Sequence, residues 1–503
     1  MPTFEFETTS PADQSADLLI LPYFNGPEPG PGFKEVGKAL GADLGAVMRD
    51  NRLRGGLGET LTVPTLGRAE PGSVLLLGLG KRAEVNADRI RRAVGKVASR
   101  AAGYVRVATT AAQATRSSWD QAAQAVVEGL LLGSYRFDRY KVRPIEEDGQ
   151  KPRLETVTIL GQSRWDARKA RRAVRRGEIF AEAAAWARDL VNTPALDATP
   201  DHLAREAQKM SRKVGLRCKV WSKAELEKGG FGGILGVGRG SENTPRLIEL
   251  SYRGDSGQPV ALTGKGVTFD SGGLSIKDAH GMEWMKADMA GAATVMAAMQ
   301  AIARLKPRVN VIAAIPSAEN LPGGSAIRPG DVLVHRGGKT SEVLNTDAEG
   351  RLILADALAY LAEKKPRAIV DLATLTGACM IALGEDIWGV MGSDRGLIRE
   401  LLAAGEEVGE PGWELPLWEG YRKQIESTVA DVKNIGNRYG GAITAALFLR
   451  EFVGEVPWAH MDIAGTAYAE KPGDYWPKGA TGNPVRTIIR YVERQAAASR
   501  TRR

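Results

Sequence analysis

The chain has 503 residues, which is more than one ordinary hydrophobic core accommodates and indicates two domains. Its hydrophobic content of 43% and charged content of 25% are typical of a soluble globular protein and exclude a disordered or fibrous one. The formal charge of +8 is a small excess that solubility largely explains. The N-terminal residues 1–24 lack the basic start and apolar core of a signal peptide, and no apolar run reaches the ~18 residues of a membrane span, so we expect a cytoplasmic protein.

The first 165 residues alternate apolar runs with alanine-rich stretches, which indicates α/β units. Buried strands are predicted at 15–24, 72–80 and 155–161, and helices at 87–103 and 119–135. We therefore expect a smaller N-terminal α/β domain over 1–165.

A long helix rich in Arg and Ala is predicted over 166–192 as the connector between the domains. The Asn192-Thr193-Pro194 sequence ends it, because the residue before a proline is disfavoured in helical geometry. Its basic part, "ARKARRAVRRGE" at 167–178, is best explained as a solvated helix face. The alternative is a DNA-binding or regulatory role through this helix, alone or in addition to another activity.

Alternation of strands and helices resumes in the C-terminal domain, expected over 193–503. Strands are predicted at 246–254, 259–266, 308–316 and 367–377, and helices at 290–305 and 351–364. The predicted fold class is thus α/β with two domains, the larger one having a mixed sheet sandwiched by helices.

Loops that leave the carboxyl ends of these strands carry four acids, namely Asp270, Asp288, Asp347 and Glu349. Gathered in one cleft, the carboxylates would repel each other, and divalent cations such as Mg²⁺, Mn²⁺ or Zn²⁺ would remove that conflict. With two cysteines and four histidines in the chain, oxygen atoms must be the main ligands. Taken singly, Asp270 could cap a turn and Asp288 could begin a helix.

Asp347 and Glu349 resist such separate explanations, because residues i and i+2 of extended backbone point to the same face. Gly350 is expected to let the chain turn after them, and Arg351 to begin a helix. Lys265 and Lys277 fit a metal site in two ways. A buried lysine beside cations can lose its proton and become a ligand, and a charged one can stabilise an oxyanion. Lysines on a glycine-rich loop also leave phosphoryl transfer open.

Five blocks carry a resemblance to a known family: "GKGVTFDSGGLSIK", "MKADMAGAA", "SAENLPGGSAIRPGDV", "NTDAEGRLILADAL" and "DLATLTGA". In this order they resemble the leucyl (cytosol) aminopeptidase family, and the similarity extends over essentially all of 190–490. The resemblance implies a metallo-exopeptidase, a hydrolase that releases N-terminal leucine and other apolar residues from peptides with a free N-terminus. It also implies attack by a water activated by two metals, and a homohexamer.

The site residues follow from the same resemblance. Two Mn²⁺ or Zn²⁺ ions would be bound by five residues, with Asp270 and Glu349 bridging, and the full set is Lys265, Asp270, Asp288, Asp347 and Glu349. Lys277 and Arg351 would be catalytic, Arg351 by holding a bicarbonate that acts as general base. The pocket for the first side chain would be formed by Met285, Thr374, Leu375, Gly377, Ala464 and Ala467.

Other functions are less consistent with the residues. A metal-dependent phosphatase lacks its usual DxDx[TV] or P-loop pattern here, and an inactive scaffold would not retain every expected ligand. Cys379 has no histidine in an obvious partner position, so we expect a buried thiol and not a nucleophile.

Overall fold

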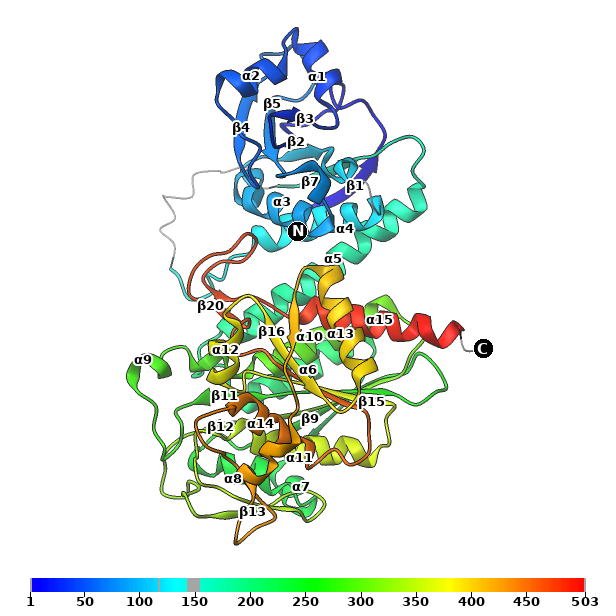
Figure 1. The fold of residues 1–503 in the computed structure, drawn as a ribbon. Helices are drawn as coiled ribbons and strands as arrows, with labels where there is room; N and C mark the ends of the chain where they lie inside the picture. The colour runs from blue at the N-terminus through cyan, green and yellow to red at the C-terminus, as the bar shows by residue number, and fades with distance from the viewer. Residues whose placement is uncertain (1, 116–117, 143–153, 502–503) are drawn as a thin grey trace. The chain divides into compact units, whose positions relative to one another are not determined.

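The computed structural model describes residues 2–115, 118–142 and 154–501, and the chain forms two compact units (Figure 1). The first unit comprises Met1–Glu182 with Lys471–Pro477, and the second comprises Ala183–Glu470 with Lys478–Arg503. Helix α5 (Ala167–Asn192) crosses this division. The domain boundaries expected from the sequence lie beside the two ends of α5, whereas the compact units divide inside this helix. In addition, the segment Lys471–Pro477 belongs to the first unit.

The first unit contains a seven-stranded sheet in the order β1-β7-β6-β2-β5-β4, with β3 paired to β2. Its strands are β1 (Thr3–Glu7), β2 (Leu18–Phe24), β3 (Glu28–Pro29), β4 (Thr60–Pro64), β5 (Ser73–Gly78), β6 (Arg106–Thr109) and β7 (Thr156–Leu160). Its helices are α1 (Phe33–Leu40), α2 (Leu44–Asp50), α3 (Ala87–Ala101) and α4 (Trp119–Gly133). The strands β1, β7, β6, β2 and β5 are parallel, and β4 is antiparallel to β5.

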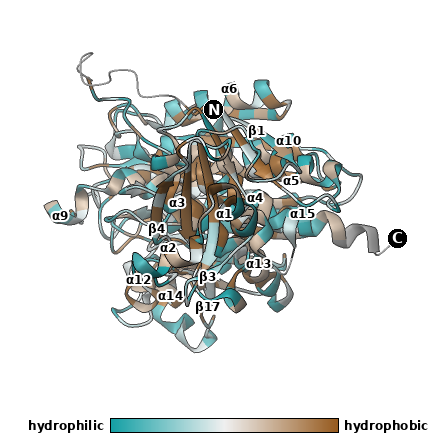
Figure 2. Ribbon diagram, turned by 90° about the horizontal axis from the view of Figure 1, so that it is seen from above, coloured by the Kyte–Doolittle hydropathy of each residue, from teal (hydrophilic) through white to brown (hydrophobic). Residues whose placement is uncertain are grey.

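Strand β2 shows why this sheet is covered on both faces. Leu18 and Ile20 pack in one apolar cluster with residues of α3 and α4, while Leu19 and Leu21 pack in a second cluster with residues of α1 and α2. Because side chains alternate along a strand, a continuous apolar run indicates burial on both faces. Figure 2 shows central strands of this unit in the brown of apolar residues.

The basic part of α5 is amphipathic. Ala173 and Val174 are buried in the core of the first unit, while Arg168, Arg171 and Arg172 are exposed. The exposed charges therefore form the solvated face of a helix that packs through its small apolar residues. Within the described ranges, no helix combines the length and apolarity needed to cross a bilayer.

The second unit contains a nine-stranded mixed sheet in the order β17-β16-β19-β15-β10-β12-β9-β8, with β11 paired to β12. Its strands are β8 (Arg217–Trp221), β9 (Arg246–Tyr252), β10 (Val260–Gly264), β11 (Gly266–Asp270), β12 (Val311–Asn320), β15 (Ala368–Ala373), β16 (Trp388–Gly392), β17 (Gly412–Glu414) and β19 (Trp458–Asp462). The central strands β12, β10, β15 and β19 are parallel, so their carboxyl ends meet at one edge.

Helices cover both faces of the central strands in the second unit. Both α10 and α11 contact β10, β12 and β15, and α11 packs in an apolar cluster with α8 and α14. The helices are α6 (Pro200–Val214), α7 (Lys223–Lys228), α8 (Gly232–Val237), α9 (Ala279–Met282), α10 (Ala290–Leu305), α11 (Gly350–Glu363), α12 (Gly377–Leu383), α13 (Arg395–Val408), α14 (Gly441–Arg450) and α15 (Val485–Thr501). The predicted fold class, two α/β domains with a mixed sheet between helices, is confirmed.

Two details of the strands differ from the prediction. The run predicted at 259–266 divides into β10 and β11, because the chain leaves the first strand at Lys265 and pairs again farther along β12. β12 extends to Asn320, beyond the predicted end at 316. Both differences place polar side chains at the carboxyl edge of the sheet.

Candidate active site

A first group of charges surrounds Lys265, which follows β10 directly. Its Nζ lies 2.7 Å from Asp288 Oδ2 and 2.8 Å from Glu349 Oε1, and it donates to the carbonyl of Thr374 at 3.1 Å. Thr374 Oγ1 in turn donates to Asp288 Oδ1 at 2.7 Å. Lys265, Asp288 and Glu349 are all buried, so this is an ionic cluster inside the protein.

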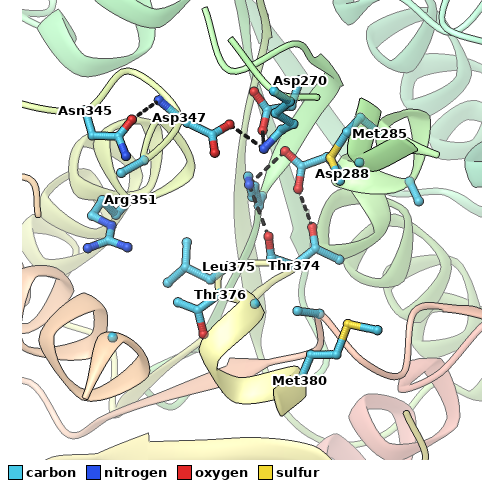
Figure 3. A pocket seen from close by; sticks show the side chains of 18 of the residues that line it. Asp270, Met285, Asp288, Asn345, Asp347, Arg351, Thr374, Leu375, Thr376 and Met380 are labelled. Carbon is cyan, nitrogen blue, oxygen red and sulfur yellow. Dashed lines mark hydrogen bonds and ion pairs between the residues drawn. The ribbon is translucent and has the colours of Figure 1, made fainter. Parts of the chain in front are cut away.

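A second group surrounds Lys277 and includes Asp270 and Asp347, which Figure 3 labels. Its Nζ lies 2.9 Å from Asp270 Oδ2 and also forms an ion pair with Asp347 Oδ1. Asp270 Oδ1 accepts from Gly272 N at 2.9 Å and from Asn320 Nδ2 at 2.8 Å. These donors hold the carboxylate in place while its other oxygen faces the lysine.

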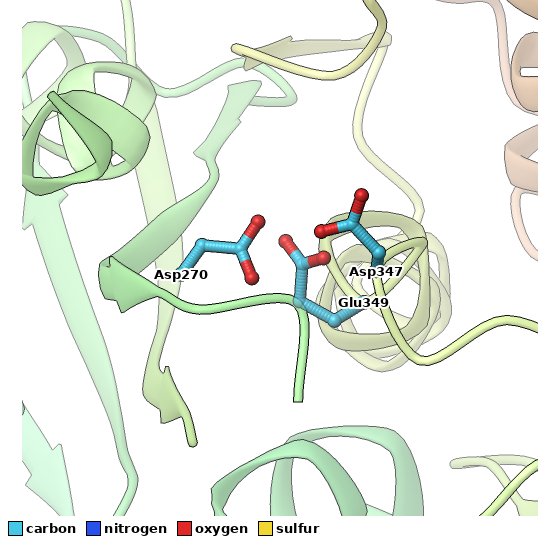
Figure 4. A group of neighbouring side chains, drawn as sticks. All are labelled: Asp270, Asp347 and Glu349. Carbon is cyan, nitrogen blue, oxygen red and sulfur yellow. The ribbon is translucent and has the colours of Figure 1, made fainter. Parts of the chain in front are cut away.

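Three carboxylates lie close enough to share a cation. Ligand oxygens of Asp270, Asp347 and Glu349 all lie within 4.8 Å of one another (Figure 4). Glu349 Oε2 is buried without a hydrogen-bond partner, and Glu349 Oε1 and Asp347 Oδ1 are buried with only an ammonium group beside each. A buried acceptor without a partner and a set of carboxylate ligands fit divalent cations. The residues present therefore fit the metal site that the sequence suggested.

The pKa values of these acids reflect a shortage of positive charge. Burial and the charge of Asp270 raise the pKa of Glu349 to about 8. Burial raises the pKa of Asp288 to about 6, against the opposing effect of Lys265. Burial alone would lower the pKa of Lys265, but Asp288 and Glu349 together raise it above its usual value. In the absence of metal the lysine is thus held as an ammonium, and a neutral lysine ligand requires cations in the site.

The turn before α11 corrects one prediction. Asp347 and Glu349 do not lie in extended backbone, because Asp347 is in a turn and Glu349 has helical dihedrals of φ −79° and ψ −32°. Their carboxylates converge because the turn is closed by side chains. Asn345 Oδ1 accepts from Asp347 N at 2.8 Å, and Asn434 Nδ2 donates to Asn345 O at 2.6 Å. This is the arrangement of an Asx turn, which sequence spacing alone does not reveal.

Gly350 also has a different role from the one expected. It is the first residue of α11 and not a residue of the turn. A Cβ atom there would lie 2.3 Å from Cε and 2.7 Å from Nζ of Lys265. A larger residue at this position would therefore force the end of the Lys265 side chain to move, since real Cβ atoms essentially never make contacts this short.

Arg351 is the second residue of α11, one position after the helix begins; it is 7% exposed and lines the pocket. Its NH1 donates to Asn434 O at 2.9 Å, and its buried Nε has no hydrogen-bond partner. Burial lowers its pKa to about 10 despite the charges of Glu349 and Asp462. Within the described part of the chain Arg351 forms no ion pair with an acid. Unused donors on a buried cation suit a bound anion.

A pocket of about 720 Å³ opens above these groups. The six residues expected to hold the first side chain all line it: Met285, Thr374, Leu375, Gly377, Ala464 and Ala467. Lys265, Asp270, Lys277, Asp288, Asp347 and Arg351 line it as well, while Glu349 is fully buried. The structure thus brings every sequence-predicted site residue to one place.

Several lining residues were not predicted from the sequence. Trp284 and Tyr468 stack with ring centroids 6.3 Å apart, and Met380 and Arg438 also line the pocket. They come from segments far apart in the chain, and no local spacing marks them. Asp462 was also not predicted, although its position at the end of a strand is a signal that the sequence offers. It ends β19 at the same edge of the sheet and accepts from Thr376 Oγ1 at 2.6 Å.

Two nucleophile candidates lie outside this chemistry. Cys379 is buried, and burial raises the pKa of its thiol to about 12, as expected for an inert cysteine. Ser341, His335 and Asp356 have the order of a catalytic triad, with distances of 2.7 Å from Ser341 Oγ to His335 Nε2 and 3.2 Å from His335 Nδ1 to Asp356 Oδ1. All three are buried and none lines the pocket, so substrate cannot reach them.

The comparisons with known proteins agree with the geometry. Residues 185–489 match the catalytic domain of the cytosol aminopeptidase family, and residues 20–144 match the N-terminal domain of the same family. A probable cytosol aminopeptidase of Geobacter sp. (strain M21) is 44% identical and aligns over 98% of this chain and 99% of its own. Another from Streptomyces coelicolor is 44% identical over 99% of both chains.

Solved structures show the same architecture. The bottromycin maturation enzyme BotP in complex with Mn is 37% identical, with a TM-score of 0.85 over 96% of this chain and 100% of that one. A mutant of tomato leucine aminopeptidase is 31% identical, with a TM-score of 0.87 over 98% and 97% of the two chains. The nucleic-acid hypothesis for helix α5 receives no support from these comparisons. This chain belongs to the cytosol aminopeptidase family and is a metal-dependent aminopeptidase.

Proposed function

We propose that the protein removes N-terminal amino acids, with leucine and other apolar residues preferred, from peptides with a free N-terminus. The observation that carries this proposal is the carboxylate triplet of Asp270, Asp347 and Glu349, of which Asp270 and Glu349 are buried, beside an apolar-lined pocket. Two Mn²⁺ or Zn²⁺ ions would be held by these acids together with Asp288 and Lys265. When bound, the pair would lower the pKa of a water and polarise the scissile carbonyl.

The residues of the chain would divide the remaining work. Met285, Leu375 and the small residues around them would bind the first side chain and exclude water from it. Lys277 would keep its charge and stabilise negative charge on the carbonyl oxygen. Arg351 would hold a bicarbonate through its unpaired Nε–H, and the bound anion would supply a general base for the reaction.

We also propose a cytoplasmic homohexamer. The cytoplasmic location is supported by the names of the Geobacter and Streptomyces relatives. Large apolar side chains exposed in the single chain, such as Ile381 (90%), Trp413 (64%) and Trp418 (62%), are of the kind that a neighbouring subunit covers. The mass of the assembly in solution, measured by light scattering, decides between this assembly and a monomer.

The metal assignment is tested with Asp347→Ala and Lys277→Ala, assayed on leucine p-nitroanilide and analysed for bound metal. We expect Asp347→Ala to lose both metal and activity, and Lys277→Ala to lose at least about 100-fold in kcat while it retains metal, because only an oxyanion donor is removed. Asp386→Ala removes an exposed acid that does not line the pocket and serves as the control. Activity that survives strong chelation, or metal loss in Lys277→Ala, would refute the division between ligands and catalytic residues.

A further inference from the structure

Asp278 and Arg438 are the charged residues of the pocket lining that belong neither to the proposed metal ligands nor to the catalytic pair, and Arg438 is the cation of the two. Arg438 lies between β18 (Val432–Lys433) and α14, and it is exposed. No ion pair joins it to an acid of the part of the chain that the structure describes. The guanidinium therefore stands at the pocket with its charge available to a ligand.

The backbone around Arg438 is held in place. Asn437 N donates to Gln424 Oε1 at 3.2 Å, and Tyr439 N donates to Asn437 Oδ1 at 2.9 Å. These two bonds fix the residues on either side of Arg438. A positioned loop with a solvated cation is a better recognition element than a loop without such bonds, because less entropy is lost on binding.

The segment that carries Arg438 begins on the Arg351 side of the pocket. Asn434 O accepts from Arg351 NH1 at 2.9 Å, and Arg438 follows four residues later, which is at most roughly 14 Å of extended chain. In Figure 3, Arg351 lies on the opposite side of Leu375 from Met285 and Met380. The apolar side suits the first side chain of a peptide, and the Arg351 side remains for the part that follows the scissile bond.

We propose that Arg438 binds a carboxylate on the leaving part of the substrate, which makes this enzyme selective for short peptides or for peptides with an acidic second residue. The proposal rests on the aminopeptidase function proposed above. Each residue of extended peptide spans roughly 3.5 Å, so a dipeptide or tripeptide carries its terminal carboxylate roughly 7 to 10 Å from its amine. An arginine that lines the pocket can bind such a carboxylate with two parallel hydrogen bonds.

The test compares kcat/KM for substrates that differ only in this carboxylate. Leu-Gly against Leu-Gly-amide reports on a terminal carboxylate, and Leu-Asp-amide against Leu-Asn-amide reports on a side-chain carboxylate. An exposed ion pair predicts a preference of about fivefold for the carboxylate in at least one pair. This preference should decrease as salt is raised, because the groups are solvated.

Variants of Arg438 identify the source of the preference. Arg438→Ala should reduce the ratio to about one, Arg438→Lys should retain part of it, and Arg438→Glu should invert it. Lys423→Ala removes an exposed cation that does not line the pocket and should leave the ratio unchanged. Because Arg438→Lys keeps the positive charge, a preference that is lost in Arg438→Ala and partly retained in Arg438→Lys depends on charge and not on a disturbance of the loop.

The outcomes distinguish this inference from the proposed function. Equal rates on free and amidated peptides in the wild type, or a preference that persists in Arg438→Ala, would overturn the inference alone. A lack of hydrolysis of every substrate, leucine p-nitroanilide included, would overturn the aminopeptidase function and the inference with it.

Discussion

Gly350→Ala separates the packing of the metal site from the stability of the helix that carries it. The new Cβ would lie 2.3 Å from Lys265 Cε and 2.7 Å from its Nζ, so the lysine must move. Alanine is favoured over glycine in a helix by about 1 kcal/mol, whereas overpacking a core costs about 1–3 kcal/mol. The two effects largely cancel, and we expect the free energy of unfolding to fall by no more than about 2 kcal/mol.

Metal binding should suffer more than stability in this variant. Lys265 contacts Asp288, Glu349 and the carbonyl of Thr374 at 2.7 to 3.1 Å, and its displacement disturbs all three contacts. We expect Mn²⁺ affinity to fall at least about tenfold, which corresponds to about 1.4 kcal/mol. Calorimetric Mn²⁺ titration and urea unfolding measure the two quantities separately.

The control for this experiment is Gly324→Ala. A Cβ atom at Gly324 has no neighbour within 4 Å, and the residue does not require a positive φ. Both metal affinity and stability should therefore stay at their wild-type values in the control. Wild-type Mn²⁺ affinity in Gly350→Ala would refute the requirement for glycine beside Lys265, and a collapse of the fold would show that the clash is not confined to the site.

Two further substitutions test the structure outside the pocket. Ser341→Ala leaves the buried Nε2 of His335 without its hydrogen-bond partner at 2.7 Å. We expect the free energy of unfolding to fall by about 1–3 kcal/mol and kcat to stay unchanged. A loss of kcat in the folded variant would contradict a purely structural role for Ser341. Glu451 accepts from Lys339 and Arg422 at 2.8 Å each, and although burial raises its pKa, these cations lower it below the ordinary 4.5. Its stabilising effect is therefore fully present above pH 4.5 and is lost as the pH falls through the lowered pKa. Glu451→Gln should be less stable than the wild type by roughly 1–2 kcal/mol in urea unfolding at pH 7, and a difference that does not shrink under acid conditions would argue against this ion pair.

The sequence by itself determined the fold class and the composition of the site. Continuous apolar runs such as 18–24 identify strands that are buried on both faces, because a strand with one solvated face would alternate. The rule that parallel strands meet at their carboxyl ends led to the loops with Lys265, Asp270 and Asp347. These are local patterns, and local patterns are readable without coordinates.

Only the tertiary structure decided how the site is held and where its pocket extends. Asp347 and Glu349 converge through a turn closed by Asn434, which lies about 90 residues away in the sequence, and not through strand-like spacing. The space that Gly350 leaves for Lys265 and the position of Arg438 at the pocket likewise depend on contacts between distant segments. Residue type and periodicity show which groups a chain offers for chemistry, whereas distances between segments arise only when packing and buried hydrogen bonds bring them together.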